Sequence, residues 1–157
     1  MMDFLEIKLA IEDELLQLCR TSADDYVRNN AGSHRDWIKY HMSAGPAYCG
    51  YYKGRLAGAA GLHIIRPGVA NVWLVIDGGF FMLPKGMIPT VESLEYLEKV
   101  VWVLKEMRDI LCRRFRIMKI RTSSRKGFGA SQRLIKFCGF ERLVKESKQN
   151  YYYIYRS

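Results

Sequence analysis

The spacing of apolar residues divides the chain into short strands and amphipathic helices. Residues 3–8 and 151–155 alternate with a period of two, which is typical of strands, whereas residues 11–29 and the segment after Thr90 repeat at helical spacing. In chain order the pattern predicts strand 3–8, helix 11–29 with a break near Thr21-Ser22, helix 33–41, strands 47–52, 56–65 and 69–77, helix 90–111, strand 117–121, helix 130–138, and strands 141–145 and 151–155.

Local signals support these boundaries. Lys53-Gly54 between two apolar runs predicts a two-residue hairpin turn, and Gly139 predicts the end of the last helix. Residues 69–77 are apolar on both faces, so we expect this strand at the centre of a sheet. The Ser- and Gly-rich residues 122–129 are expected to form a loop. The order β-α-α-β-β-β-α-β-α-β-β predicts one α+β domain over residues 1–157.

Composition narrows the class of protein. Apolar residues make up 49% of the 157, and no apolar run approaches the roughly 18 residues that a membrane span needs. The first residues have no basic region, so we expect no signal peptide. The four cysteines lack metal-type spacing, so we expect buried, reduced thiols in a cytoplasmic protein, and no metal.

Charge is divided unevenly along the chain. Residues 1–98 contain 9 Lys and Arg against 12 Asp and Glu, whereas residues 99–157 contain 16 against 4, a net charge of +12. This asymmetry favours an anionic partner near the C-terminal half, such as a phosphate-bearing cofactor, nucleic acid or an acidic protein, or else marks a solvated surface.

The C-terminal segment carries a family resemblance. Leu134 to Phe140, a short helix that ends in Gly-Phe before a terminal hairpin, resembles the GNAT superfamily of N-acetyltransferases, and the order of the other elements is similar along nearly the whole chain. More narrowly, the chain looks like compact GNAT-like proteins encoded by phages. The resemblance implies an α+β fold with a mixed, mostly antiparallel sheet of six to seven strands and about four flanking helices.

The resemblance also implies a site for acetyl-CoA as acyl donor. The backbone of Leu74, Val75 and Ile76 would pair with the pantetheine arm. Lys85 and Gly86 before the long helix would meet the pyrophosphate, although Pro84 and Pro89 remove two amide donors there. Ser123 and Ser124, just past the fifth family strand, would bond pantetheine or phosphate.

Two positions depart from the family pattern. Counting back from Gly139-Phe140, the usual Asn falls on Phe128, and the usual Tyr that protonates the departing thiolate falls on Ile135, which cannot donate a proton. The remaining candidates for proton transfer are Asp77, His63 and Tyr153, each of which also has an ordinary structural role.

Three functions therefore stay open. The first is N-acyl transfer, with acetyl passed from acetyl-CoA to a small-molecule or protein amine by direct attack. The second is a degenerate GNAT fold that serves as an interaction module, located in a virion if the protein is phage-derived. The third is nucleic-acid binding through the basic C-terminal half. An exposed edge strand also offers a route to a homodimer.

Overall fold

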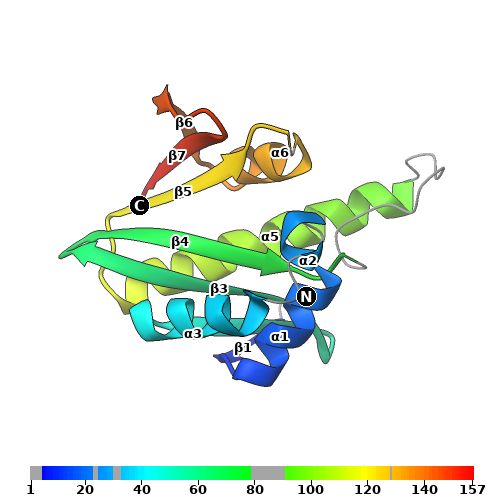
Figure 1. Cartoon of the computed structure of the whole chain (residues 1–157). Helices are drawn as coiled ribbons and strands as arrows, with labels where there is room; N and C mark the ends of the chain where they lie inside the picture. The colour runs from blue at the N-terminus through cyan, green and yellow to red at the C-terminus, as the bar shows by residue number, and fades with distance from the viewer. Residues whose placement is uncertain (1–4, 23–24, 30–32, 79–90, 128) are drawn as a thin grey trace.

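The computed structural model describes residues 5–22, 25–29, 33–78, 91–127 and 129–157, and it is built on one seven-stranded sheet (Figure 1). The elements are β1 (Leu5–Leu9), α1 (Glu12–Thr21), α2 (Asp25–Asn29), α3 (His34–Ala44), β2 (Ala47–Tyr52), β3 (Arg55–Arg66), β4 (Val69–Ile76), α5 (Val91–Arg114), β5 (Lys119–Arg125), α6 (Gly129–Phe137), β6 (Glu141–Glu146) and β7 (Asn150–Arg156).

The strand order is β1-β2-β3-β4-β5-β7-β6, and only the β4–β5 pair is parallel. This arrangement confirms the predicted α+β class and the mostly antiparallel sheet. It also confirms that residues 69–77 form a central strand, since β4 is fourth of seven. The predicted break in the first helix separates α1 from α2.

The turns follow their local chemistry. Lys53 and Gly54 both have positive φ, 51° and 76°, as a type I′ hairpin turn requires. Gly139 has φ 87° and ends α6, because glycine enters the left-handed region without a steric penalty.

One predicted boundary was wrong. Residues 122–125 were expected to begin a loop, but β5 continues to Arg125 because Thr122 to Arg125 pair antiparallel with Tyr153 to Asn150. Backbone pairing with β7 therefore overrides the weak strand propensity of the serines.

Two apolar clusters lie on opposite faces of the first four strands. On one face α1 and α3 supply Leu15, Leu18, Cys19 and Ile38, which pack against Cys49 and Val75. On the other face α5 supplies Met107, Leu111 and Cys112, which pack against Leu62 and Ala70. All four cysteines are buried free thiols, as predicted. No helix among the described residues is long and apolar enough to cross a membrane.

Candidate functional site: a cleft between diverging strands

The site is created where β4 and β5 separate. The two strands pair only at Val69, Ala70 and Asn71, opposite Lys119, Ile120 and Arg121, and beyond these residues they diverge (Figure 1). At the point of separation the Thr122 hydroxyl donates a hydrogen bond to the Val72 carbonyl oxygen over 3.2 Å. The sheet is therefore continuous at one end and forked at the other.

The fork leaves part of the β4 backbone without a strand partner. The Asp77 amide donates to Ala57 on the β3 side, whereas the Val72 carbonyl faces β5. Because backbone polar groups point alternately to the two sides of a strand, those of Leu74 and Ile76 face the opening. Leu74 thus presents an unpaired strand edge, whereas the end of β4 is met by Ser22, which forms an isolated antiparallel bridge with Asp77 and also lines the opening.

A cleft of about 530 Å³ occupies the fork. Its wall from β4 includes Val72, Leu74 and Ile76, and its wall from β5 includes Thr122, Ser123, Ser124 and Arg125. Helix α5 contributes Leu104, Met107, Arg108 and Leu111, and α6 contributes Leu134, Ile135 and Cys138. Leu74 is 41% exposed although it is a large apolar side chain, because it faces this cleft.

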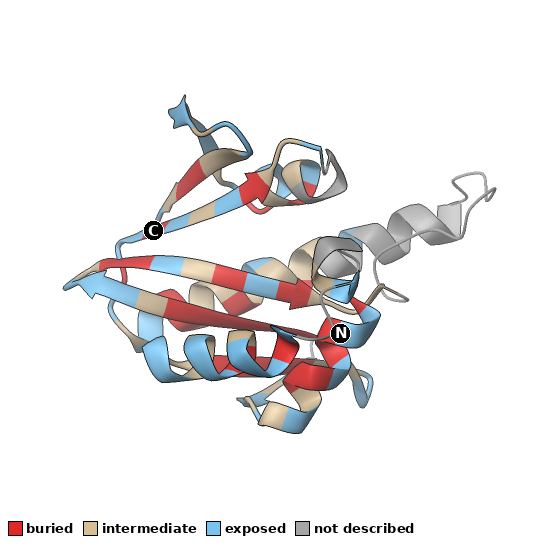
Figure 2. Cartoon of the chain, in the orientation of Figure 1, coloured by how far each residue is buried: buried red, intermediate tan, exposed pale blue. Residues whose placement is uncertain are grey.

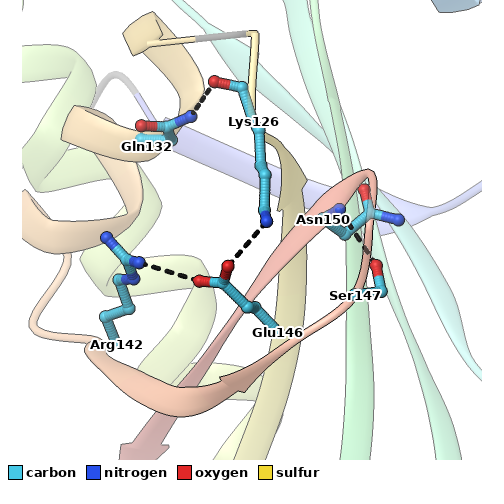
Figure 3. Close-up of polar contacts among 6 residues, drawn as sticks. All are labelled: Lys126, Gln132, Arg142, Glu146, Ser147 and Asn150. Atoms are coloured by element: carbon cyan, nitrogen blue, oxygen red, sulfur yellow. Dashed lines mark hydrogen bonds and ion pairs between the residues drawn. The ribbon is translucent and has the colours of Figure 1, made fainter.

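The far wall of the cleft is held by contacts between β5, α6 and the β6–β7 hairpin (Figure 3). The Gln132 side-chain amide donates to the carbonyl oxygens of Arg125 and Lys126 over 3.0 and 2.8 Å. Lys126 Nζ lies 2.7 Å from Glu146, which also accepts from Arg142 over 3.1 Å. The pKa of Glu146 is lowered, mainly by its hydrogen bond to Lys126. These contacts join the end of β5 to α6 and to the β6–β7 hairpin, while the backbone ladder aligns β5 with β7.

One polar side-chain atom of a lining residue, Ser124 Oγ, has no hydrogen-bond partner among the described residues, and Ser124 is only 5% exposed. Trp73 Nε1 also has none there, but the Trp73 indole packs over Gly61 and against Trp37 under α3. A buried polar atom without a partner costs stability unless a ligand or water satisfies it. The Ser124 hydroxyl is therefore available to a polar group of a ligand.

Proton-transfer groups are scarce in the cleft. The described lining contains no carboxylate, histidine or tyrosine, and its titratable side chains are Arg108, Arg125 and Cys138. Burial raises the pKa of the Cys138 thiol to about 11, so this thiol is neutral near pH 7. Ile135, which stands where the resemblance led us to look for a Tyr, is one of the lining residues.

The structure places some of the predicted cofactor-binding residues in the cleft and others outside it. Leu74, Ile76, Ser123 and Ser124 line the cleft, whereas the Val75 side chain packs in the cluster under α1 and α3. Lys85, Gly86 and Phe128 lie outside the described residues.

The predicted catalytic residues lie apart from one another. Tyr153 is 1% exposed and is not part of the cleft lining. Asp77 forms an ion pair with Arg55 at 3.0 Å. His63 lies on the α3 face of the sheet, where its Nε2 is 2.8 Å from His41 Nδ1. The structure does not bring these three candidates together.

Sequence reasoning missed the aromatic group around His63. His41 lies 5.1 Å, between ring centroids, from Trp73, a residue of the cleft wall. Burial, and secondarily the charge of His63, lower the pKa of His41 to about 4. The histidine pair is therefore joined to the cleft through an aromatic contact, which no spacing in the sequence could have indicated.

Comparisons with known proteins agree with this geometry. No protein-family model matches the sequence, and no curated protein matches it significantly. Among solved structures, the RimL ribosomal alpha-N-protein acetyltransferase in complex with coenzyme A has a TM-score of 0.65 at 14% identity, over 98% of this chain and 94% of that one.

Two further structures have the same architecture. A GNAT-family acetyltransferase from Bacillus anthracis has a TM-score of 0.65 at 14% identity, with 98% of this chain and 95% of that one covered. The aminoglycoside acetyltransferase AAC(6')-Ib in complex with ribostamycin and coenzyme A has a TM-score of 0.66 at 15% identity, with coverages of 98% and 94%. The names of these neighbours do not support the narrower likeness to phage proteins. The seven-stranded forked sheet and these neighbours together show that this chain has the GNAT fold.

Proposed function

We propose that the protein is an acyl-CoA-dependent N-acyltransferase that passes an acetyl group from acetyl-CoA to an amine. The observation that carries the proposal is the fork, in which the unpaired β4 edge at Leu74 borders an apolar cleft of about 530 Å³. Several structural neighbours were solved with coenzyme A or acetyl-CoA bound, which supports the same ligand.

The residues of the cleft fit such a ligand. Peptide-like amides of a pantetheine arm would pair with the backbone of Leu74 and Ile76, as an added strand does at a sheet edge. The partnerless Ser124 hydroxyl would bond a polar group of the same arm, and the Leu74 side chain would contact its apolar part. The thioester that this cofactor supplies is an activated acyl group.

The chain itself would act mainly by positioning. Backbone N–H groups of β4 that face the opening would stabilise negative charge on the thioester oxygen. The cleft would hold the amine next to the carbonyl carbon, which raises the effective concentration of the two reactants. Since no tyrosine is among the described lining residues, we expect solvent to supply the proton that the departing thiolate needs.

Acetyl-CoA binding to the purified protein, measured by calorimetry with a thermal-shift control, tests this proposal. Leu74→Glu places a charge on the apolar wall and should weaken binding about tenfold or more. Ile64→Glu is the matched control, because Ile64 is 46% exposed on β3 and outside the cleft. Equal binding by the two variants, or none by the wild type at millimolar ligand, would reject the proposed site.

A second function is favoured by the composition of the cleft. The absence of carboxylate, histidine and tyrosine from the described lining is also expected if the fold is kept as an interaction module without catalysis. Binding of acetyl-CoA without thiol release, across a panel of amines, would favour this second function over acyl transfer.

A further inference from the structure

One face of β5 is strongly basic and largely exposed. Side chains alternate along a strand, so Lys119, Arg121, Ser123 and Arg125 share one face of β5. Arg121 pairs with Asn71, which pairs with His63, so this is the sheet face on which α1 and α3 lie. Helices α1 and α3 contact β3, and α1 also contacts β4. Lys119, Arg121 and Ser123 are exposed. In Figure 2 much of the β5 ribbon is accordingly pale blue.

This basic stripe of β5 starts inside the cleft. Ser123 and Arg125 line the cleft, together with Asn150 of β7, which pairs with Arg125. Arg121 sits at the point of separation, opposite the last paired residue of β4. At about 3.3 Å per residue, Arg121 and Arg125 are roughly 13 Å apart along the strand, with Ser123 between them.

The end of the stripe at Lys119 and Arg121 is rich in cations. Within the described residues, no salt bridge involves Lys119, Arg121 or Arg156, and Lys119 pairs across the strands with Arg156, which adds a further cation. Glu141 is the carboxylate on this face of β6, and β7 separates it from β5. Asp77 at the end of β4 is already paired with Arg55. Among the described residues, the surface around Arg121 therefore carries more cations than carboxylates.

We propose that the acceptor amine carries an anionic group, a phosphate or a carboxylate, that binds at Arg121 and along the basic stripe of β5. This inference rests on the proposed acyl transfer and names its substrate class. A guanidinium binds either anion through two parallel charge-assisted hydrogen bonds, so Arg121 would fix the acceptor while its amine reaches the cleft beside Ser123. Like-charge repulsion disfavours acceptors with several positive charges.

Matched pairs of amines test the inference. O-phosphoethanolamine is compared with ethanolamine, and β-alanine with β-alaninamide, by ligand-observed NMR binding and by thiol release from acetyl-CoA. We expect the anionic member of one pair to bind and react about tenfold better. The pair with the larger preference identifies phosphate or carboxylate as the group. Arg121→Gln should remove that preference, whereas Lys136→Gln, on an exposed position of α6, should keep it.

The NMR binding measurement distinguishes a failure of this inference from a failure of the proposed function. A charge preference that disappears in Arg121→Gln supports the anion site whether or not acetyl-CoA binds. Equal binding of both members of each pair, or a preference that survives in Arg121→Gln, would overturn it. Acetyl-CoA binding without any charge preference would leave the proposed function in place and remove only the substrate class.

Discussion

The two halves of the sheet are built differently. Strands β1 to β4 are enclosed by α1 and α3 on one face and α5 on the other, and both faces contain buried apolar clusters. Strand β5 carries an exposed basic face, and the edge strand β6 includes the fully exposed Val144. The difference indicates that the first half supplies most of the stability, while the second half supplies one wall of the cleft.

Gly45→Ala should give the largest loss of stability, in the half of the molecule that contains β1 to β4. A Cβ at Gly45 would lie 1.8 Å from the Leu62 carbonyl oxygen, so backbone has to move. We expect a loss of about 3 kcal/mol or more in the free energy of unfolding, measured by urea denaturation. Gly127→Ala in the second half is the control, because nothing lies within 4 Å of its added Cβ. Similar losses in both variants would contradict the comparison.

Leu62→Ala should be the next largest change. Leu62 is completely buried between β3 and α5, so its truncation leaves a cavity and should cost about 2–3 kcal/mol. Val144→Ala, at a 100% exposed position of β6, should leave the urea midpoint unchanged. A marked loss in Val144→Ala would show that β6 is covered in solution.

The histidine pair should make the first half sensitive to acid. The pKa of His41 falls from 6.5 to about 4 on folding, so between these values the unfolded chain binds more protons than the folded one. The contribution of neutral His41 to the free energy of unfolding is therefore fully present above pH 6.5 and decreases as the pH falls toward 4. The loss should be about 1–2 kcal/mol after allowance for partial exposure. His41→Gln should flatten this part of a Tm-versus-pH curve, and an unchanged slope would rule out His41 as its source.

Glu146→Gln should have the smallest effect on stability. Glu146 joins Lys126 and Arg142 at the surface of the second half, and exposed ion pairs contribute little. The lowered pKa of Glu146 means that its contribution is present above pH 4.5 and is lost as the pH falls further. Among the destabilising variants named above, we expect Glu146→Gln to give the smallest Tm shift, and high salt should abolish that shift. A shift as large as that of Leu62→Ala would be inconsistent with a surface role.

The sequence predicted the fold better than the site. Alternation, the Lys53-Gly54 turn and Gly139 are local signals, and each was found where the pattern placed it. The continuation of β5 through Ser123 and Ser124 depends on partner residues 29 and 27 positions later, which local propensity cannot report.

The candidate site was predicted only in part. Four predicted residues line the cleft: Leu74, Ile76, Ser123 and Ser124. They could be predicted because the family resemblance indicated which strands border the cofactor. The contact between His41 and His63 joins α3 to β3 across 22 positions, and the basic stripe of β5 needs the strand register. Both arise from tertiary pairing, so neither follows from spacing along the chain.

The hydrogen bond from Thr122 to Val72 has a consequence for how such a cleft can change. A strand presents the same face only at every second residue, so the point at which two strands part can move only in steps of two residues, about 6.6 Å. The depth at which a ligand binds between the strands can therefore change only in such steps. The Thr122 hydroxyl, bonded to Val72 where the strands part, marks the depth that this chain adopts.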